Sequence, residues 1–223
     1  MTGVHSADAG RIELCDTPIN PQSPLDAQRQ GISTVYQEVN LLPNLSVAHN
    51  LYLGREPRRF GVIQWRLLRR NAEALLRQFD VHIDVSESLS SYSIAIQQLV
   101  AIARAVDCSA KVLILDEPTA SLDSREVAVL FRILRNLREQ GVAILFVTHF
   151  LDQVYDLTDR ITVLRNGEKV GTFNTAELPR AQLVAHMLGK ELQSVEAQKP
   201  VQGGDDDDST TLQMQELSTS QGL

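Results

Sequence analysis

The chain has 223 residues, enough for one large or two small domains. Its 21 lysines and arginines against 28 aspartates and glutamates give a net charge of −7, which argues against a general nucleic-acid binder. Two distant cysteines without C-x-x-C spacing suggest neither a disulfide framework nor a zinc site, so a reducing, cytosolic setting fits best. No apolar run approaches the roughly 18 residues that span a bilayer.

The first half of the chain predicts short extended segments followed by helices. Residues 1–40 are expected to be extended and broken by turns, including a proline-rich loop at Pro18, Pro21 and Pro24. Residues 64–79 have apolar side chains at helical spacing, which predicts a helix. Its outer face carries arginines, and exposure of these charges to solvent is sufficient to explain them. A second helix is predicted at about 95–106, with Ser93 as its N-cap.

A strand–helix–strand unit is the best-supported local architecture. The apolar runs at 111–116 and 142–147 predict strands covered on both faces of a parallel sheet. Between them, residues 124–140 have one apolar helical stripe. Asp123 and Glu126 form a D-x-x-E start like a capping box. The order predicts a right-handed crossover with parallel strands.

The last part of the chain predicts two paired strands, a helix and a linker. Strands at 161–165 and 169–173 flank Asn166-Gly167, with a loop slightly longer than the tightest hairpin. A helix is predicted at about 180–188. Residues 193–211 lose hydrophobic periodicity and contain four consecutive aspartates, which is typical of an acidic flexible linker.

Two adjacent carboxylates follow the first apolar strand, in the string VLILDEPTASLD at 112–123. The C-terminal edge of a parallel sheet is where α/β proteins bind ligands. Asp116 could hold Mg²⁺ directly or through water, and Glu117 could orient and deprotonate a water that attacks a γ-phosphate. The alternative is an ordinary polar strand end.

This string resembles the Walker B and D-loop of the ATPase subunits of ABC transporters. Three further segments occur in the order that the family shows along its chain. Val35–Glu38 resembles the Q-loop and Tyr92–Gln98 a degenerate signature motif, both before this string, and Val147–His149 resembles the switch-histidine segment after it. The resemblance implies an α/β, P-loop NTPase-like ABC ATPase domain, with a helical subdomain at about 45–108.

The resemblance also implies roles for individual residues. Glu117 and His149 would act catalytically at the γ-phosphate of ATP, while Asp116 and Gln37 would contact Mg²⁺. The implied nucleotide-binding residues are Gln37, Ser93, Ala95, Gln98 and Asp123. Alternatives stay open: His149 could be structural, and Asp123 could only cap its helix. Ile94 and Ala95 replace glycines of the usual signature pattern.

Finer similarities favour the monosaccharide importers within this family. The segments YQEVNL at 36–41 and LGRE at 53–56 are similar to that group, and residues 1–190 look like the ATPase of a galactofuranose importer. The resemblance implies ATP hydrolysis that drives a membrane permease, at the cytoplasmic face of the inner membrane. Its implied partners are permease subunits, a second ATPase domain or subunit and, indirectly, a periplasmic sugar-binding protein. No nucleic acid is implied.

The phosphate-loop pattern G-x-x-x-x-G-K-[ST] does not occur in the sequence. We therefore expect residues 1–192 to be an incomplete nucleotide-binding domain that lacks the phosphate-loop strand and helix, and residues 212–223 to begin a truncated second ATPase domain. The missing strand would flank the Walker B strand, so the isolated chain is expected to be unstable and inactive. The alternative is a non-enzymatic module that donates signature contacts to, or competes with, a full ATPase subunit.

Overall fold

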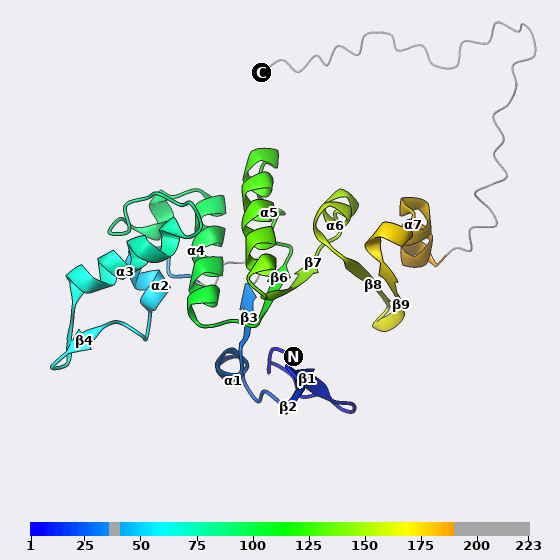
Figure 1. Cartoon of the computed structure of the whole chain (residues 1–223), viewed down its shortest axis with the longest axis horizontal. Coiled ribbons are helices and arrows are strands. Elements are labelled where there is room, and N and C mark those ends of the chain that lie inside the picture. The colour runs from blue at the N-terminus through cyan, green and yellow to red at the C-terminus, as the bar shows by residue number, and fades with distance from the viewer. Residues whose placement is uncertain (36–40, 190–223) are drawn as a thin grey trace, which may run out of the picture. The chain divides into compact units, whose positions relative to one another are not determined.

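The computed structural model describes residues 1–35 and 41–189 (Figure 1). Gln37, the predicted linker at 193–211 and the predicted second domain at 212–223 lie outside the described residues. These described residues divide into two compact units: Met1–Ile161 with Thr172–Glu177, and Thr162–Gly171 with residues 178–189. In the described part of the chain, every helix is too short or too polar to cross a bilayer.

The predicted extended segments are present at the N-terminus, but the predicted proline-rich loop is wrong at two of its three prolines: Pro18 lies in a strand and Pro24 in a helix. Strands β1 (Ile12–Leu14) and β2 (Thr17–Ile19) form an antiparallel pair. The prediction of a loop at Pro24 is wrong, because Pro24 begins helix α1 (Pro24–Arg29). Ser23 caps this helix by accepting a hydrogen bond from the Asp26 amide at 3.2 Å. Proline suits the first helical position, where its missing N–H has no partner to lose.

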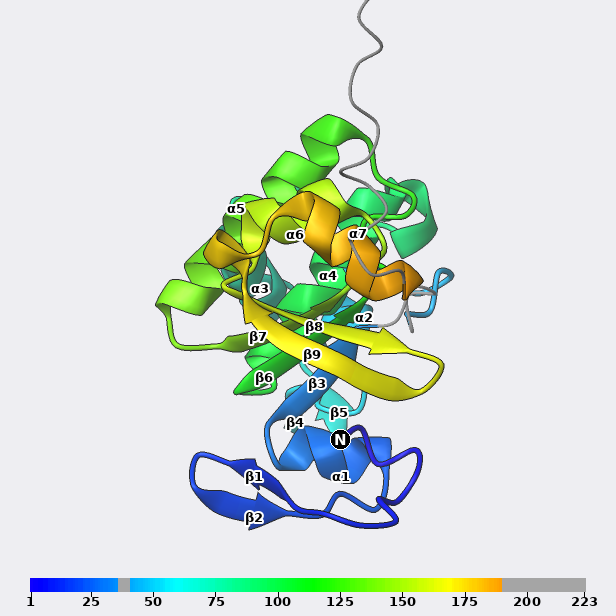
Figure 2. The same cartoon turned by 90° about the vertical axis from the view of Figure 1, so that its right-hand side faces the viewer.

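A three-stranded parallel sheet forms the centre of the larger unit. Its order is β3 (Ile32–Val35), β6 (Val112–Asp116), β7 (Ala143–Val147), and α5 (Ser124–Glu139) connects the last two (Figure 2). The predicted parallel pairing of β6 and β7 is confirmed. The register sets Asp116 opposite Val147, so both strands end at the same edge.

The prediction that the Walker B strand lacks a neighbour is wrong, because β6 pairs with β3 on one side and β7 on the other. The prediction of cover on both faces holds for β6 but fails for β7. Leu113 and Leu115 of β6 are fully buried, whereas Leu145 and Val147 of β7 are 45% and 44% exposed. Within the described residues β7 is an edge strand, and only its other face packs on the core.

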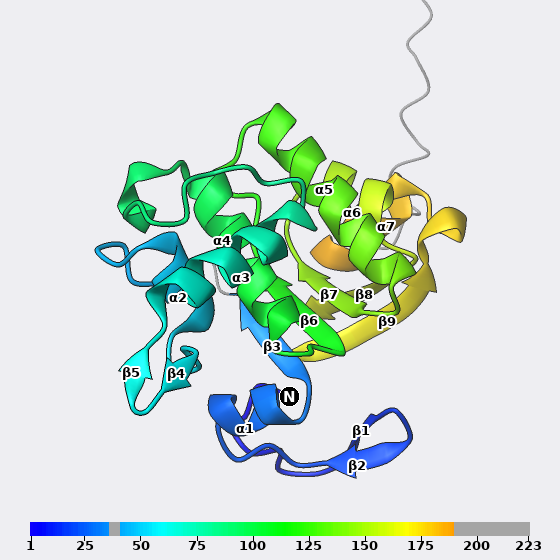
Figure 3. The same ribbon diagram turned by 60° about the vertical axis from the view of Figure 1, so that its left-hand side comes forward.

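A group of helices follows β3 in sequence (Figure 3). It comprises α2 (Val47–Tyr52), α3 (Trp65–Arg77), the 3₁₀ turn η1 (Leu89–Ser91) and α4 (Ile94–Asp107). Leu51, Leu68 and Ile102 lie in the hydrophobic core that these helices share with the sheet. Within this group the predictions contain neither α2, nor η1, nor the antiparallel hairpin of β4 (Arg58–Arg59) and β5 (Val62–Ile63).

The elements after β7 are α6 (Leu151–Leu157), β8 (Arg160–Arg165), β9 (Glu168–Asn174), the 3₁₀ turn η2 (Thr175–Glu177) and α7 (Arg180–Leu188). The predicted final helix is confirmed. The prediction of a longer loop between β8 and β9 is wrong, because Asn166 and Gly167 are the whole connection. Both have positive φ, 52° and 81°, as the tightest hairpin turn requires.

Candidate functional site

The carboxyl ends of β6 and β7 bring together residues that are distant in sequence. Asp116 ends β6, Glu117 follows it, and His149 comes two residues after β7 ends. The Glu117 amide donates to the Val147 carbonyl at 2.9 Å, which extends the sheet pairing by one residue. Parallel pairing therefore places the predicted Walker B carboxylates beside the predicted switch histidine.

Glu117 and His149 are in direct contact. His149 Nδ1 lies 2.8 Å from Glu117 Oε1. The Glu117 side chain is 22% exposed and that of His149 is 65% exposed, so the pair lies at the surface with the carboxylate on its inner side. Glu117 Oε2 is buried and has no hydrogen-bond partner among the described residues. A buried carboxylate oxygen without a donor is costly, so this atom is available for a water or ligand donor.

The neighbouring carboxylate suits a divalent cation. Asp116 is exposed at the sheet edge, and carboxylate oxygens are preferred ligands of Mg²⁺. In the described ranges, no three His, Cys, Asp or Glu side chains gather in a metal-binding group. Mg²⁺ commonly takes one or two protein carboxylates and completes its shell with water and substrate phosphates. Asp116 is therefore suited to be one of the few protein ligands of a hydrated Mg²⁺.

A second contact joins the loops that follow these two strands. Thr119 Oγ1 donates to the Gln153 side-chain oxygen at 2.6 Å, and Thr119 is only 3% exposed. Gln153 lies in the first turn of α6, just after His149. This hydrogen bond holds the loop of Glu117 against the helix that follows His149. Thr119 and Gln153 are 34 positions apart, so no local sequence pattern predicts this contact.

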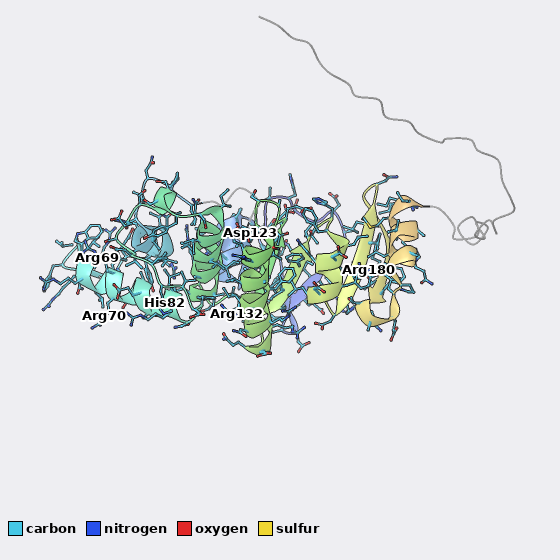
Figure 4. The ribbon with its side chains drawn as sticks, turned by 90° about the horizontal axis from the view of Figure 1, so that it is seen from above. Arg69, Arg70, His82, Asp123, Arg132 and Arg180 are labelled. Atoms are coloured by element: carbon cyan, nitrogen blue, oxygen red, sulfur yellow. The ribbon has the colours of Figure 1, made fainter. Side chains whose placement is uncertain are left out.

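Asp123 caps α5, as predicted (Figure 4). Its Oδ1 accepts hydrogen bonds from the Arg125 and Glu126 amides, both at 2.8 Å. Glu126 Oε2 in turn accepts from the Asp123 amide at 3.1 Å, which completes the capping box. The cap is therefore confirmed, and a contact of Asp123 with nucleotide stays a prediction.

The predicted signature residues lie at the start of α4. Ser93 caps this helix and also donates to Glu126 Oε1 at 3.4 Å. Ser93, Ala95 and Gln98 line one small cavity of about 110 Å³. Gln98 is 3% exposed, and its Nε2 has no partner among the described residues. The structure thus gathers the predicted residues into two sets, one at the sheet edge and one at the α4 N-terminus.

The family model for ABC transporters matches residues 1–120, more than half of the chain. The chain belongs to the ABC transporter family. It is 57% identical over 192 residues to the galactofuranose transporter ATP-binding protein YtfR of Escherichia coli K12, covering 86% of this chain and 38% of that protein. It is 51% identical over 203 residues to the fructose import ATP-binding protein FruK of Bifidobacterium longum, covering 89% and 40%. The chain thus spans about two fifths of the length of these relatives.

Solved ABC cassettes share the fold. One ATP-binding cassette of an ABC transporter aligns with a TM-score of 0.71 at 22% identity, covering 84% of this chain and 79% of that one. A dimeric cassette in a post-hydrolysis state, bound to ADP and Pi, aligns with a TM-score of 0.63 at 23% identity, covering 78% and 77%. The predicted ABC ATPase fold class is therefore confirmed, as is the family resemblance.

Proposed function

We propose that this chain forms part of the nucleotide-binding subunit of a carbohydrate ABC importer, with a monosaccharide such as galactofuranose as cargo. The observation that carries the proposal is the Glu117–His149 pair at the end of β6, with Glu117 Oε2 buried and unpartnered. The names of the relatives support sugar import. The proposed location is the cytoplasmic face of the inner membrane, where the subunit would contact permease subunits and a second ATPase domain. A periplasmic sugar-binding protein would be an indirect partner.

Each site residue would have a separate role in phosphoryl transfer from ATP to water, with ADP as the leaving group. ATP with Mg²⁺ would supply the electrophilic γ-phosphate and neutralise its charge. Asp116 would hold the cation through its exposed carboxylate. Glu117 would accept a proton from the attacking water at Oε2, while His149 Nδ1 fixes Oε1 at 2.8 Å. Thr119 would act as a positioning residue, because it anchors the loop that follows Glu117.

Nucleotide contacts elsewhere are part of the same proposal. Ser93 lies at the N-terminus of α4, where backbone N–H groups and the helix dipole favour a phosphate. Ala95, Gln98, Asp123 and Gln37 are proposed nucleotide-binding residues, and Gln37 also a magnesium contact. Because the sequence contains no G-x-x-x-x-G-K-[ST], we propose that a polypeptide of these 223 residues alone does not hydrolyse ATP.

A chimeric cassette tests the proposal. Residues 1–189 of this chain would replace the matching segment of the Escherichia coli relative, which is 57% identical, so that the rest of the cassette comes from that protein. We expect the chimera to hydrolyse ATP. Glu117→Gln should lower kcat by about 10²- to 10⁴-fold while leaving nucleotide binding intact. Glu139→Gln, an exposed carboxylate at the end of α5, is the matched control and should keep full activity. Equal activity of the two variants would show that Glu117 does not take part in the catalytic step.

A non-enzymatic role is the second candidate. It is favoured by the capped α4 N-terminus with Ser93, together with the missing phosphate-loop pattern. Such a module would donate signature contacts to a complete ATPase subunit or compete with it. Titrating this chain into a full-length relative should then raise or lower ATP turnover with a defined stoichiometry. Unchanged turnover at every ratio would exclude this role.

A further inference from the structure

The β4–β5 hairpin and the first turns of α3 form a surface that the site does not use. We name residues 58–70 the arginine hairpin. This segment contains five arginines and no acidic residue, in a chain whose net charge is −7. Figures 1 and 3 show the β4–β5 hairpin extending outward from the helices α2 and α3. Arg58 and Arg59 lie on this projection, whereas Arg66, Arg69 and Arg70 lie on α3, where Arg69 and Trp65 also line a cavity.

The tip of the arginine hairpin is apolar and solvent-exposed. Phe60 is 93% exposed, Val62 68% and Trp65 44%. Phe60 and Gly61 form the turn, with φ of 51° and 82°. Glycine or asparagine is the usual residue at the first of these positions, because a side chain there is strained. Phe60 is therefore an unusual residue for this turn position, and its side chain is not buried within the chain.

Most of the arginine charge is not neutralised within the described residues. Arg58 pairs with Glu56 at 3.3 Å, and the Arg59 guanidinium lies 5.5 Å from the centre of the Phe60 ring. Of the four arginines of α3, only Arg77 makes an ion pair in the described part of the chain, with Glu73 at 3.6 Å. Arg66, Arg69 and Arg70 make none there. Figure 4 shows Arg69 and Arg70 on α3. Residues three and four apart share a helix face, so Arg66, Arg69 and Arg70 form one charged face of α3.

A carboxylate near this surface feels the positive charge without neutralising it. Hydrogen bonds from Ser86 lower the pKa of Asp84, and the Arg69 charge lowers it further. The Ser86 hydroxyl, and not an arginine, donates a hydrogen bond to Asp84 Oδ1 at 2.6 Å. The guanidinium groups of Arg66, Arg69 and Arg70 therefore remain available for an external anion.

We propose that the arginine hairpin binds an anionic phospholipid surface. Phe60 and Val62 would enter the boundary between headgroups and acyl chains, and the arginines would contact lipid phosphates. Exposed aromatic and aliphatic side chains flanked by cations are typical of interfacial membrane binding. A projecting apolar tip suits a fluid bilayer better than a rigid protein groove. This inference deepens the proposed function, because a transporter ATPase works beside a membrane.

The chain contains its own reporter for this interaction. Trp65 is the only tryptophan in the sequence, and it lies in the arginine hairpin with its ring 4.7 Å from that of His49. The full chain would be mixed with vesicles of phosphatidylcholine alone and of phosphatidylcholine with phosphatidylglycerol at about three to one. We expect binding only to the anionic vesicles, weakening at high ionic strength. Trp65 emission should shift to shorter wavelength and be quenched by lipids brominated in the acyl chain.

Matched variants separate charge from apolar insertion. Replacing three arginines with glutamine (Arg59, Arg66 and Arg70) should weaken vesicle binding more than about tenfold. The control removes the same charge from exposed arginines elsewhere: Arg11, Arg29 and Arg125. Phe60→Ser should weaken binding about tenfold, whereas Leu164→Ser, which changes a 70% exposed leucine, should not. Circular dichroism would verify that each variant is folded.

Three outcomes would overturn the proposal. The first is absence of binding to anionic vesicles by a folded chain. The second is binding that leaves Trp65 emission unchanged or that the control triple weakens equally. The third is loss of permease association, rather than vesicle binding, in the Arg59, Arg66 and Arg70 variant, which would assign the surface to a protein partner. The vesicles contain no nucleotide or permease, so failure here is distinguishable from failure of the ATPase proposal.

Discussion

The strands β6 and β7 have nearly the same apolar sequence character but different environments. Leu113 and Leu115 in β6 are fully buried, whereas Leu145 and Val147 in β7 are nearly half exposed. The difference lies in the faces of the two strands: both faces of β6 are packed, whereas only the face of β7 with Ile144 and Phe146 packs on the core among the described residues. An apolar run therefore predicts a strand, but the elements that pack on its two faces decide how much of it is buried.

Matched leucine substitutions give the largest expected contrast between the two strands. Leu115→Ala should lower the free energy of unfolding by about 2–5 kcal/mol, because it leaves a cavity in a fully packed site. Leu145→Ala should cost less than about 1 kcal/mol, because that side chain is 45% exposed. Urea denaturation followed by circular dichroism measures both. Equal losses would show that β7 is buried as deeply as β6 in solution.

The contact between the loops after β6 and β7 should have the next largest effect. Thr119→Val removes the 2.6 Å hydrogen bond and leaves Gln153 Oε1 without that donor, so we expect a loss of about 1–2 kcal/mol. Thr17→Val is the control, since its hydroxyl makes an exposed 3.4 Å hydrogen bond and its loss should be negligible. In the chimeric cassette, Thr119→Val should also lower kcat more than KM. An unchanged kcat would leave Thr119 with a structural role only.

The helices that precede and follow β6 have caps of unequal geometry. Asp123 accepts two amide hydrogen bonds at 2.8 Å, and Asp123→Ala should cost about 1 kcal/mol. Ser93 accepts one at 3.4 Å, so Ser93→Ala should cost less, at about 0.5 kcal/mol. Thermal unfolding of both variants shows which substitution lowers the stability more. The reverse order would mean that α4 depends on its cap more than α5 does.

The smallest effect concerns the opposite edge of the sheet, where α1 packs beside β3. A hydrogen bond from the Gln22 amide, with a smaller contribution from Gln30, lowers the pKa of Asp26. A lowered carboxyl pKa contributes stability above the ordinary aspartate value, and this contribution disappears as the pH falls through the folded-state pKa. Asp26→Asn should therefore be slightly less stable than the parent at neutral pH and equal to it in acid. Tm values measured from pH 7 downward test this, and a constant gap would exclude the ionised carboxylate as the cause.

The candidate site was largely predictable because its parts are encoded locally. The D-x-x-E spacing predicted the Asp123 cap, and the adjacent carboxylates after an apolar run predicted Glu117, whereas His149 was predicted from the resemblance to ABC ATPases. The bond of Thr119 to Gln153 joins residues 34 positions apart, and no local pattern encodes it. The arginines of α3 were expected only to be solvated. The helical spacing of residues 64–79 gives no sign that Phe60, in the preceding turn, is exposed.

The sequence by itself determined the family, the parallel β6–α5–β7 unit and the residues that end its strands. Periodicity, caps and turn residues act over a few positions, so they can be seen without a structure. The tertiary structure alone decided that β6 is central and β7 is an edge, that Pro24 begins a helix beside β3, and that His149 contacts Glu117 at 2.8 Å. These features depend on which segments become neighbours in space, and packing between distant residues determines that choice.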